Sequence, residues 1–263
     1  MGVNLNQLKE MDTKKIIGIF FDIDDTFSTD GKITSEAFES IWRLKQTGKY
    51  VIPITGRPAG WCDHIARMWP VDAVVGENGA FYFMIKDGKF IKRYTADPNK
   101  ISKYKDKLAA IEKEVLEKIP SSALASDQNY REFDLAIDFC EDMPHLPKEQ
   151  IDEIVKIFKN GGLNTKVSSI HVNGWFGEYD KLTTAKIFAK NELNIDLDKD
   201  NSQFVFCGDS PNDEPMFKFF DNSVGVANVL NFEDQMKHMP KYITPSKSGN
   251  GFVELANKLI RTS

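Results

Sequence analysis

Two carboxylates follow directly after an apolar run near the start of the chain. Residues 16–21 are apolar apart from one glycine, and Asp22, Ile23 and Asp24 come next. Residues two apart along an extended chain point to the same side, so Asp22 and Asp24 can converge if the backbone stays extended past the strand. Mg²⁺ would neutralise them, because it takes oxygen ligands and often sits between carboxylates and substrate phosphates. The pattern indicates phosphate chemistry.

Two other interpretations of this stretch are a simple turn and a calcium loop. Residues 25–31 are mostly of types that are common in turns, but a turn does not explain the apolar run that precedes Asp22. A calcium loop that begins at Asp22 needs Gly at its sixth position and Glu at its twelfth, where this chain has Phe27 and Ile33. We therefore set the calcium loop aside.

A second acidic loop follows an apolar strand predicted over residues 202–207. It reads Gly208-Asp209-Ser210-Pro211-Asn212-Asp213. Helix capping explains part of it, with Ser210 as N-cap, Pro211 as the first helical residue and Asp213 closing the turn. Asp209 and Asn212 remain unexplained by capping, which favours a metal site.

Three further polar residues lie at element ends. Thr55 and Arg57 follow a strand predicted over 50–54, where an ordinary turn is the simpler reading. Asn78 lies in the loop after the strand predicted over 72–75, where it can bond a substrate hydroxyl. Lys181 begins a predicted helix, and a cation is mildly unfavourable there, which favours a functional role over a solvated one.

The elements that must position these residues alternate between strand and helix. This alternation predicts right-handed crossovers and a parallel sheet whose carboxyl edge carries the site. The strands of this part are predicted over residues 16–21, 50–54, 72–75, 202–207 and 223–226, and the helices over 34–47, 59–68, 181–193, 214–220 and 251–260.

The middle of the chain has a different pattern. Asp87-Gly88 predicts a hairpin over residues 81–94. An α+β block follows, with helices predicted over 100–118 and 148–159 and strands over 133–139, 165–172 and 175–179. We expect residues 96–179 to form an inserted domain, and residues 1–95 and 180–263 to form the two parts of the core.

Composition excludes several function classes. The 263 residues are 41% hydrophobic and carry a formal net charge of -5 with no basic stripe, so we expect no nucleic-acid partner. No apolar run approaches the ~20 residues of a membrane span, so we expect a cytoplasmic protein. The three cysteines lie far apart and predict neither disulfides nor a zinc site.

The acidic loops resemble motifs of the haloacid dehalogenase (HAD) superfamily. Residues 21–26 are similar to its first motif and residues 208–213 to its fourth, while Thr55 and Lys181 match the second and third. By this resemblance Asp22 is the nucleophile and Asp24 the general acid/base. Mg²⁺ is held by the Asp22 and Asp209 carboxylates and the Asp24 carbonyl.

The other matched residues have supporting roles by the same resemblance. Thr55 and Lys181 hold the phosphoryl oxygens, Arg57 adds a bond to substrate, and Asn212 and Asp213 orient Lys181 and metal waters. Two positions depart from the family pattern, since Asp25 and Leu182 stand where Gly is frequent.

The insertion resembles the cap of subclass IIB, which includes Cof-like and sucrose-phosphate phosphatases. This implies an α/β fold with a Rossmannoid parallel-sheet core and an α+β cap of C2B type. The implied function is a Mg²⁺-dependent phosphatase acting on a small phosphomonoester, such as a sugar phosphate, as a monomer or small homo-oligomer. A sugar phosphomutase and a non-catalytic sugar-phosphate-binding regulator are the alternatives. Cap residues such as Arg131 and Trp175 are expected to select the substrate.

Overall fold

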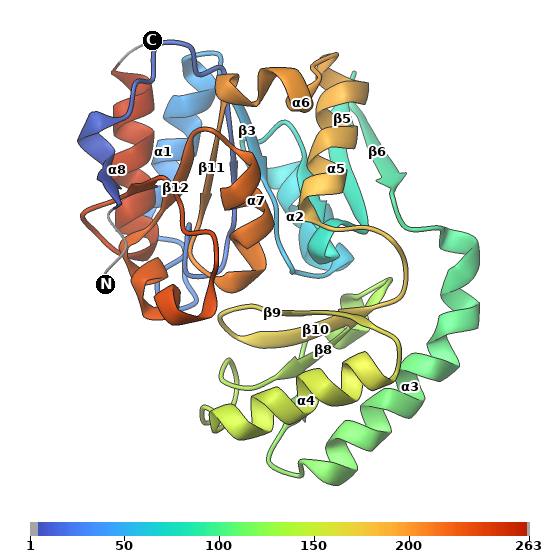
Figure 1. Ribbon diagram of the computed structural model, residues 1–263. Helices are drawn as coiled ribbons and strands as arrows, with labels where there is room; N and C mark the ends of the chain where they lie inside the picture. The colour runs from blue at the N-terminus through green and yellow to red at the C-terminus, as the bar shows by residue number, and fades with distance from the viewer. Residues whose placement is uncertain (1–4, 262–263) are drawn as a thin grey trace.

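The structure, a computed structural model that describes residues 5–261, has a parallel sheet flanked by helices and a smaller antiparallel unit at one end of it (Figure 1). All neighbouring strands of the six-stranded sheet run parallel. In sheet order they are β1 (Asn6–Gln7), β13 (Tyr242–Ile243), β12 (Ser223–Gly225), β11 (Phe204–Gly208), β2 (Gly18–Phe21) and β3 (Tyr50–Pro53). The predicted α/β fold class is confirmed.

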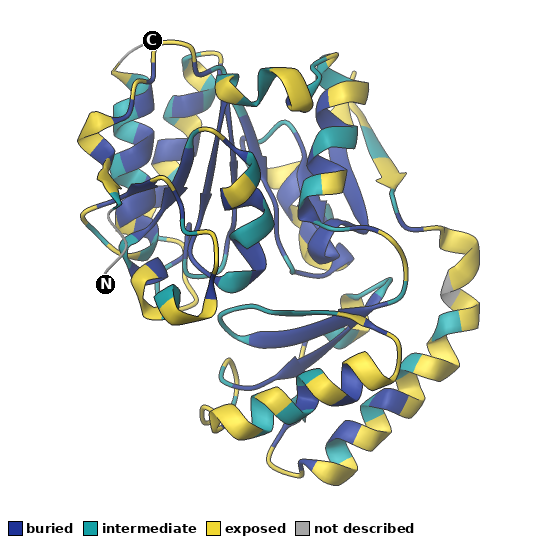
Figure 2. Ribbon diagram, viewed as in Figure 1, coloured by how far each residue is buried: buried dark blue, intermediate teal, exposed yellow. Residues whose placement is uncertain are grey.

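Alternating side chains of β2 build the two halves of the core. Ile19 and Phe21 pack toward α1 (Ser35–Gln46) and α8 (Ser248–Ile260). Phe20 points to the opposite face, where α5 (Lys181–Phe188) and α7 (Glu214–Phe219) cover the sheet. Because both faces are covered, the strand is apolar throughout, and the central strands are buried along their length (Figure 2).

The order of the strands explains where the loops that carry the predicted site residues meet. β3 and β11 lie on either side of β2, although one follows it closely in the chain and the other comes much later. The backbone N–H of Asp22 donates to Cys207 O at 2.9 Å, and that of Ile54 donates to Phe21 O at 2.7 Å. The loops that follow these three strands therefore share one point of the carboxyl edge, where the strand order reverses.

A three-stranded antiparallel sheet extends the core beyond β3. It consists of β4 (Val74–Gly76), β5 (Phe81–Lys86) and β6 (Lys89–Tyr94), with α2 (Ala59–Met68) packed against it. The hairpin at Asp87-Gly88 is confirmed, and both residues have positive φ. The strand predicted over 72–75 meets the parallel sheet through a single bridge, between Ile54 and Val75, and through a hydrogen bond from Asp72 N to Val51 O. Its regular pairing is antiparallel.

The smaller unit has its own sheet and its own apolar cluster. The strands, in sheet order, are β7 (Ala123–Leu124), β8 (Asp134–Asp138), β10 (His171–Trp175) and β9 (Asn164–Val167), and the helices are α3 (Ile101–Lys118) and α4 (Lys148–Asn160). Leu135 and Ile137 of β8 pack with the two helices on one face. The alternate positions, Asp134 and Asp138, are buried polar residues of the other face. We propose that residues 96–179 form one cap domain.

The two strands predicted over 165–172 and 175–179 are wrong in their bounds. The chain turns at residues 168–170 instead, and Asn173 and Gly174 lie inside β10. Ser168 makes this turn, because its hydroxyl accepts from the N–H groups of Ile170 and His171. Gly174 is a strand residue here because the ring of Phe158 occupies the space of a side chain.

Several short features were not predicted. The helix predicted over 181–193 is α-helical only to Phe188, and Ala189–Leu193 form a π-helical turn. The helix α6 (Leu197–Asp200) and the two-residue strands β1 and β13 had no counterpart in the prediction. Elements this short have too few residues to show a period.

We predict that Gly174→Ala destabilises the protein by about 1–3 kcal/mol, because the added Cβ would overlap the buried Phe158 ring. Urea denaturation measures this difference in the free energy of unfolding. Thr165→Ala is the matched control, since Thr165 is the cross-strand partner of Gly174 and its side chain is partly exposed. Equal stability of Gly174→Ala and wild type would contradict this packing.

Candidate active site

Asp22 and Lys181 form a buried ion pair at the carboxyl edge of the sheet. Nζ of Lys181 lies 2.6 Å from Oδ1 of Asp22, although the two residues are 159 positions apart in the chain. Asp22 follows β2, and Lys181 is the first residue of α5, whose N-cap is Asp180. The ammonium group also donates to Asp213 Oδ1 at 2.8 Å. One cation therefore joins two of the predicted loops.

Asp209 and Asp213 complete an acidic cluster with Asp22. One carboxylate oxygen from each of the three residues lies within 4.8 Å of the others, and all three side chains are buried. Oδ2 of Asp213 accepts from the N–H of Asp209 at 3.1 Å and from that of Ser210 at 3.4 Å, and the second bond closes the capping box predicted from the sequence. Gly208 is required here, because a side chain at that position would overlap the Asp213 carboxylate.

The charges of this cluster do not balance within the protein. Burial raises the pKa of Asp22 to about 8, and the Lys181 ammonium only partly offsets it. Burial and the nearby Asp22 carboxylate also raise the pKa of Asp209. Burial opposes the charge of Lys181, but Asp213 and Asp22 outweigh it and raise the pKa of Lys181 above its usual range. Three carboxylates beside one ammonium group therefore fit a divalent cation with oxygen ligands.

Asp24 lies apart from this cluster and pairs with Arg57. The guanidinium donates to Oδ1 of Asp24 from Nη2 at 2.7 Å and from Nε at 3.0 Å. The same Arg57 also lies against Asp127 and Glu141 of the cap. Burial opposes the charge of Arg57, but these acids, Asp24 foremost, raise its pKa further. The side chains of Asp22 and Asp24 thus have different partners, and Arg57 connects core and cap.

Thr55 and Asn78 lie in adjoining loops beside β2. The N–H of Asn78 donates to Thr55 O at 3.1 Å, and the Thr55 hydroxyl accepts from Arg57 N at 3.0 Å. Asn78 is 2% exposed, and its Nδ2 has no hydrogen-bond partner within the described chain. It lines a narrow space together with Lys181 and Asn212. A buried donor without a partner in that space fits a ligand oxygen.

Several site residues were not predicted from the sequence. Asn228 donates to Asp209 Oδ2 at 3.1 Å and to Asp25 O at 3.0 Å, and Thr26 donates to Asp209 Oδ1 at 3.1 Å. Asn228 and Thr26 therefore hold the Asp209 carboxylate in place. Asn228 lies three residues after β12, so its place at the end of a parallel strand is the only signal in the sequence.

Glu77 was also missed, and it fastens the cap to the core. Its carboxylate accepts from the N–H of Ala59 at 3.0 Å and from those of Glu132 and Phe133 at 2.8 and 2.6 Å. Glu77 itself is fully buried and has φ of 43°. A left-handed conformation is costly for Glu, so these hydrogen bonds must stabilise it.

Arg131 and Trp175, the cap residues expected to select the substrate, are held by contacts within the fold. The Arg131 side chain is fully buried and pairs with Asp127 and Asp134. Trp175 is 2% exposed, and its Nε1 donates to Tyr179 O at 3.2 Å. Arg131 borders a larger cavity between α2 and the cap loop, and Trp175 the narrow space beside Lys181, so a part in substrate selection stays a prediction for both.

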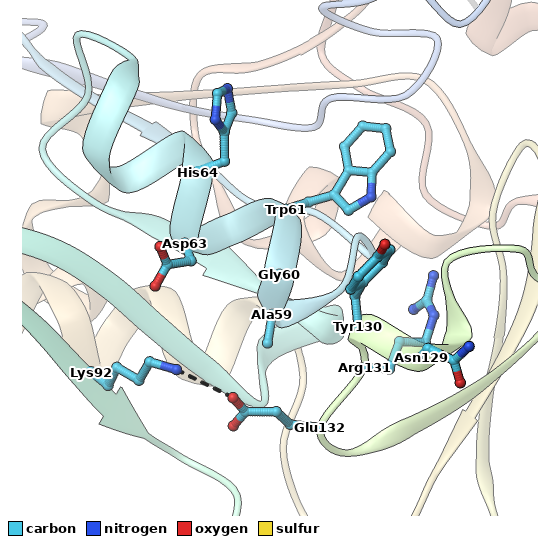
Figure 3. A pocket seen from close by; sticks show the side chains of 10 residues that line it. All are labelled: Ala59, Gly60, Trp61, Asp63, His64, Lys92, Asn129, Tyr130, Arg131 and Glu132. Carbon is cyan, nitrogen blue, oxygen red and sulfur yellow. Dashed lines mark hydrogen bonds and ion pairs between the residues drawn. The ribbon is translucent and has the colours of Figure 1, made fainter.

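A cavity of about 710 Å³ lies away from the acidic cluster, between α2 and the cap loop (Figure 3). Trp61 and Tyr130 face each other across it, and Trp61 lies over the Arg57 guanidinium at 4.5 Å. Arg131 borders this cavity, but none of the residues predicted for catalysis, phosphate binding or metal binding does. We therefore assign the chemistry to the acidic cluster and not to this larger space.

A family model for haloacid dehalogenase-like hydrolases matches residues 19–255. The chain belongs to the haloacid dehalogenase-like hydrolase family. The resemblance drawn from the loop motifs is thereby confirmed. No curated protein sequence matches this chain.

Solved structures share the fold of this hydrolase, including the inserted cap. A protein of Thermoplasma acidophilum has a TM-score of 0.71 at 18% identity, covering 94% of this chain and 99% of that one. A HAD/COF-like hydrolase of Plasmodium vivax has a TM-score of 0.70 at 19% identity, covering 98% and 100%. The sucrose-phosphatase of Synechocystis, solved with sucrose and phosphate, has a TM-score of 0.64 at 18% identity, covering 92% and 97%. Within residues 5–261, no helix combines the length and apolar character needed to cross a bilayer.

We predict that Glu141 stabilises the protein in a pH-dependent way. Burial alone would raise the pKa of Glu141, but His171, whose Nε2 lies 2.9 Å from Oε2, and the Arg57 guanidinium outweigh it and lower the pKa to about 2. A lowered pKa in the folded state means that the stabilisation is complete above about pH 4.5 and is lost as the pH falls toward 2.

The measurement compares Glu141→Gln with wild type by urea denaturation at pH 6 and pH 3. The wild type should be the more stable at pH 6, and the difference should narrow at pH 3. Glu39→Gln, an exposed change on α1, is the control and should show no such narrowing. A difference that is equal at both pH values would contradict the ion-pair account.

Proposed function

We propose that this hydrolase is a Mg²⁺-dependent phosphatase that acts on a small phosphomonoester, such as a sugar phosphate, through an aspartyl-phosphate intermediate. The observation that carries the proposal is the buried contact between Asp22 and Lys181 beside Asp209. Such a site offers a nucleophilic oxygen, a cation for the phosphoryl group and carboxylates for a metal. The phosphatases among proteins of the same fold support it.

In the first step Asp22 is the nucleophile. Its Oδ1 is held by Lys181, so the carboxylate is oriented and its second oxygen can attack phosphorus. The new bond joins Asp22 to phosphorus as the bond to the leaving oxygen breaks. Lys181 stabilises the negative charge on the phosphoryl oxygens, and the Thr55 hydroxyl provides a further donor.

Asp24 serves both steps as acid and base. It protonates the leaving oxygen first, and then takes a proton from the water that attacks phosphorus and frees Asp22. Arg57 donates to Asp24 in this structure, which presents Asp24 as a proton acceptor, the form that the second step requires. For the first step, Arg57 has to release a protonated Asp24 to the leaving group.

Asp22, Asp209 and the Asp24 carbonyl are the groups that would hold Mg²⁺. Bound there, Mg²⁺ would offset the repulsion between the anionic nucleophile and the anionic phosphate. Asp213 has both oxygens in hydrogen bonds, to Lys181 and to the Asp209 N–H, so we assign it to the positioning of these two residues. Asn228 and Thr26 orient Asp209.

The cap favours small substrates in this proposal. Arg57 and Glu77 fasten it over the acidic cluster, which leaves no open surface for a phosphoprotein. Asn78 has an unused buried donor suited to a substrate oxygen. The sucrose-phosphatase of Synechocystis, of the same fold, lends support to a sugar phosphate. We further propose action in the cytoplasm, as a monomer or small homo-oligomer.

We predict that Asp22→Asn lowers phosphate release on the order of 10³-fold or more while the fold is retained. A panel of phosphorylated metabolites and p-nitrophenyl phosphate measures this, with circular dichroism as the check on folding. Asp30→Asn, the same change in an exposed turn, is the control and should keep activity. A folded Asp22→Asn variant that retains turnover would overturn the mechanism. Isomeric sugar phosphates instead of free phosphate would indicate a mutase.

We predict that chelation abolishes phosphate release and that Mg²⁺ restores it. Ca²⁺ should fail to replace Mg²⁺, because it prefers longer bonds and more ligands than this compact cluster provides. The measurement is phosphate release after EDTA treatment and addition of each ion. Full activity after removal of all divalent ions, or equal rates with Ca²⁺, would contradict the metal assignment.

A further inference from the structure

A second groove runs along the edge of the cap sheet. Its volume is about 420 Å³, and it lies between α4 and β9 on the cap side and the loops after β11 and β12 on the core side. Pro211, Asn212 and Phe232 form the core wall. β9 is an edge strand of the cap sheet, so its outer side is open to this space.

The groove carries positive charge that the protein does not neutralise. Lys148, Lys159 and Lys166 line it, and within residues 5–261 none of them has an ion-pair partner. Asp152 is the only carboxylate among the residues that line it, and the His145 imidazole lies in the same wall. Three lysines facing one acid favour an anionic ligand.

The cavity between α2 and the cap loop differs in this respect. Its Lys92 and Glu132 pair with each other at 3.3 Å, as Figure 3 shows. Asp63 pairs with Arg67 at 2.7 Å, and Arg131 with Asp127 at 3.0 Å. Charged residues are thus present in both walls, but only the groove beside β9 leaves its cations without partners.

The groove continues to the catalytic residues through Lys166 and Asn212. These two residues line both the groove and the narrow space that contains Lys181 and Asn78. Asn78 Nδ2 is the buried donor without a partner in that space. Of the three groove lysines, Lys166 is therefore the one that borders the space around Lys181 and Asn78.

We propose that Lys166 binds a second anionic group on the substrate. The inference rests on the proposed phosphatase function. It narrows the substrate class to small phosphomonoesters that also carry a carboxylate or a second phosphate. Lys166 is placed closest to the chemistry, because it is the only lysine of the three that shares a space with Lys181.

Two matched substrate pairs test this and distinguish the two anions. Glycerol 3-phosphate and 3-phosphoglycerate differ by a carboxylate, and fructose 6-phosphate and fructose 1,6-bisphosphate by a phosphate. We expect the wild type to favour the member with the extra anion in at least one pair, by about tenfold in kcat/KM. Lys166→Gln should remove most of this preference through KM, and Lys166→Arg should restore it. Hydrolysis of p-nitrophenyl phosphate should stay unchanged.

The control is Lys113→Gln, an exposed change on α3, which should keep the wild-type preference. A preference for 3-phosphoglycerate identifies the second anion as a carboxylate, and a preference for fructose 1,6-bisphosphate identifies it as a phosphate. Either result supports the subsite. Turnover without preference in either pair, or a preference that Lys166→Gln leaves intact, would overturn the subsite and leave the phosphatase standing. Absence of turnover for every compound, p-nitrophenyl phosphate included, would overturn the proposed function and the subsite with it.

Discussion

The site depends on the burial of three carboxylates with one ammonium group at the edge of the sheet. Lys181 contacts Asp22 and Asp213 at 2.6 and 2.8 Å, and Asp209 lies within the same cluster. Burial of like charges is costly unless a cation compensates them. The raised pKa values of Asp22 and Asp209 express that cost. The remaining features of the core follow from it, since Gly208 admits the Asp213 carboxylate and neighbouring donors fix Asp209.

The cap is attached to the core by charge and hydrogen bonding around the same edge. Glu77 binds backbone N–H groups of the cap, and Arg57 bridges Asp24 to Asp127 and Glu141. Arg57 thus connects the cap with Asp24, the proposed acid/base. Release of Asp24 by Arg57 and movement of the cap are physically connected, because the same guanidinium takes part in both.

The sequence alone predicted the elements whose local residue pattern matches their position in the folded protein. An apolar run that ends in Asp22 is explained by a central parallel strand with a site at its end, and the structure contains that strand. Gly174 misled the prediction, because its space is occupied by Phe158, a residue of α4 from which it is separated by β9. The cap contacts of Glu77 and Arg57 could not be predicted, since their partners in the cap lie more than 50 residues away.

The central claim is that Asp22 becomes covalently phosphorylated during turnover. Rapid quenching of the enzyme with a substrate, followed by borohydride reduction and peptide mass spectrometry, tests it directly. Borohydride converts an aspartyl phosphate to homoserine, so the account predicts homoserine at position 22 only when substrate and Mg²⁺ are both present. An unmodified Asp22 under conditions of rapid turnover, or modification at another carboxylate, would contradict the account.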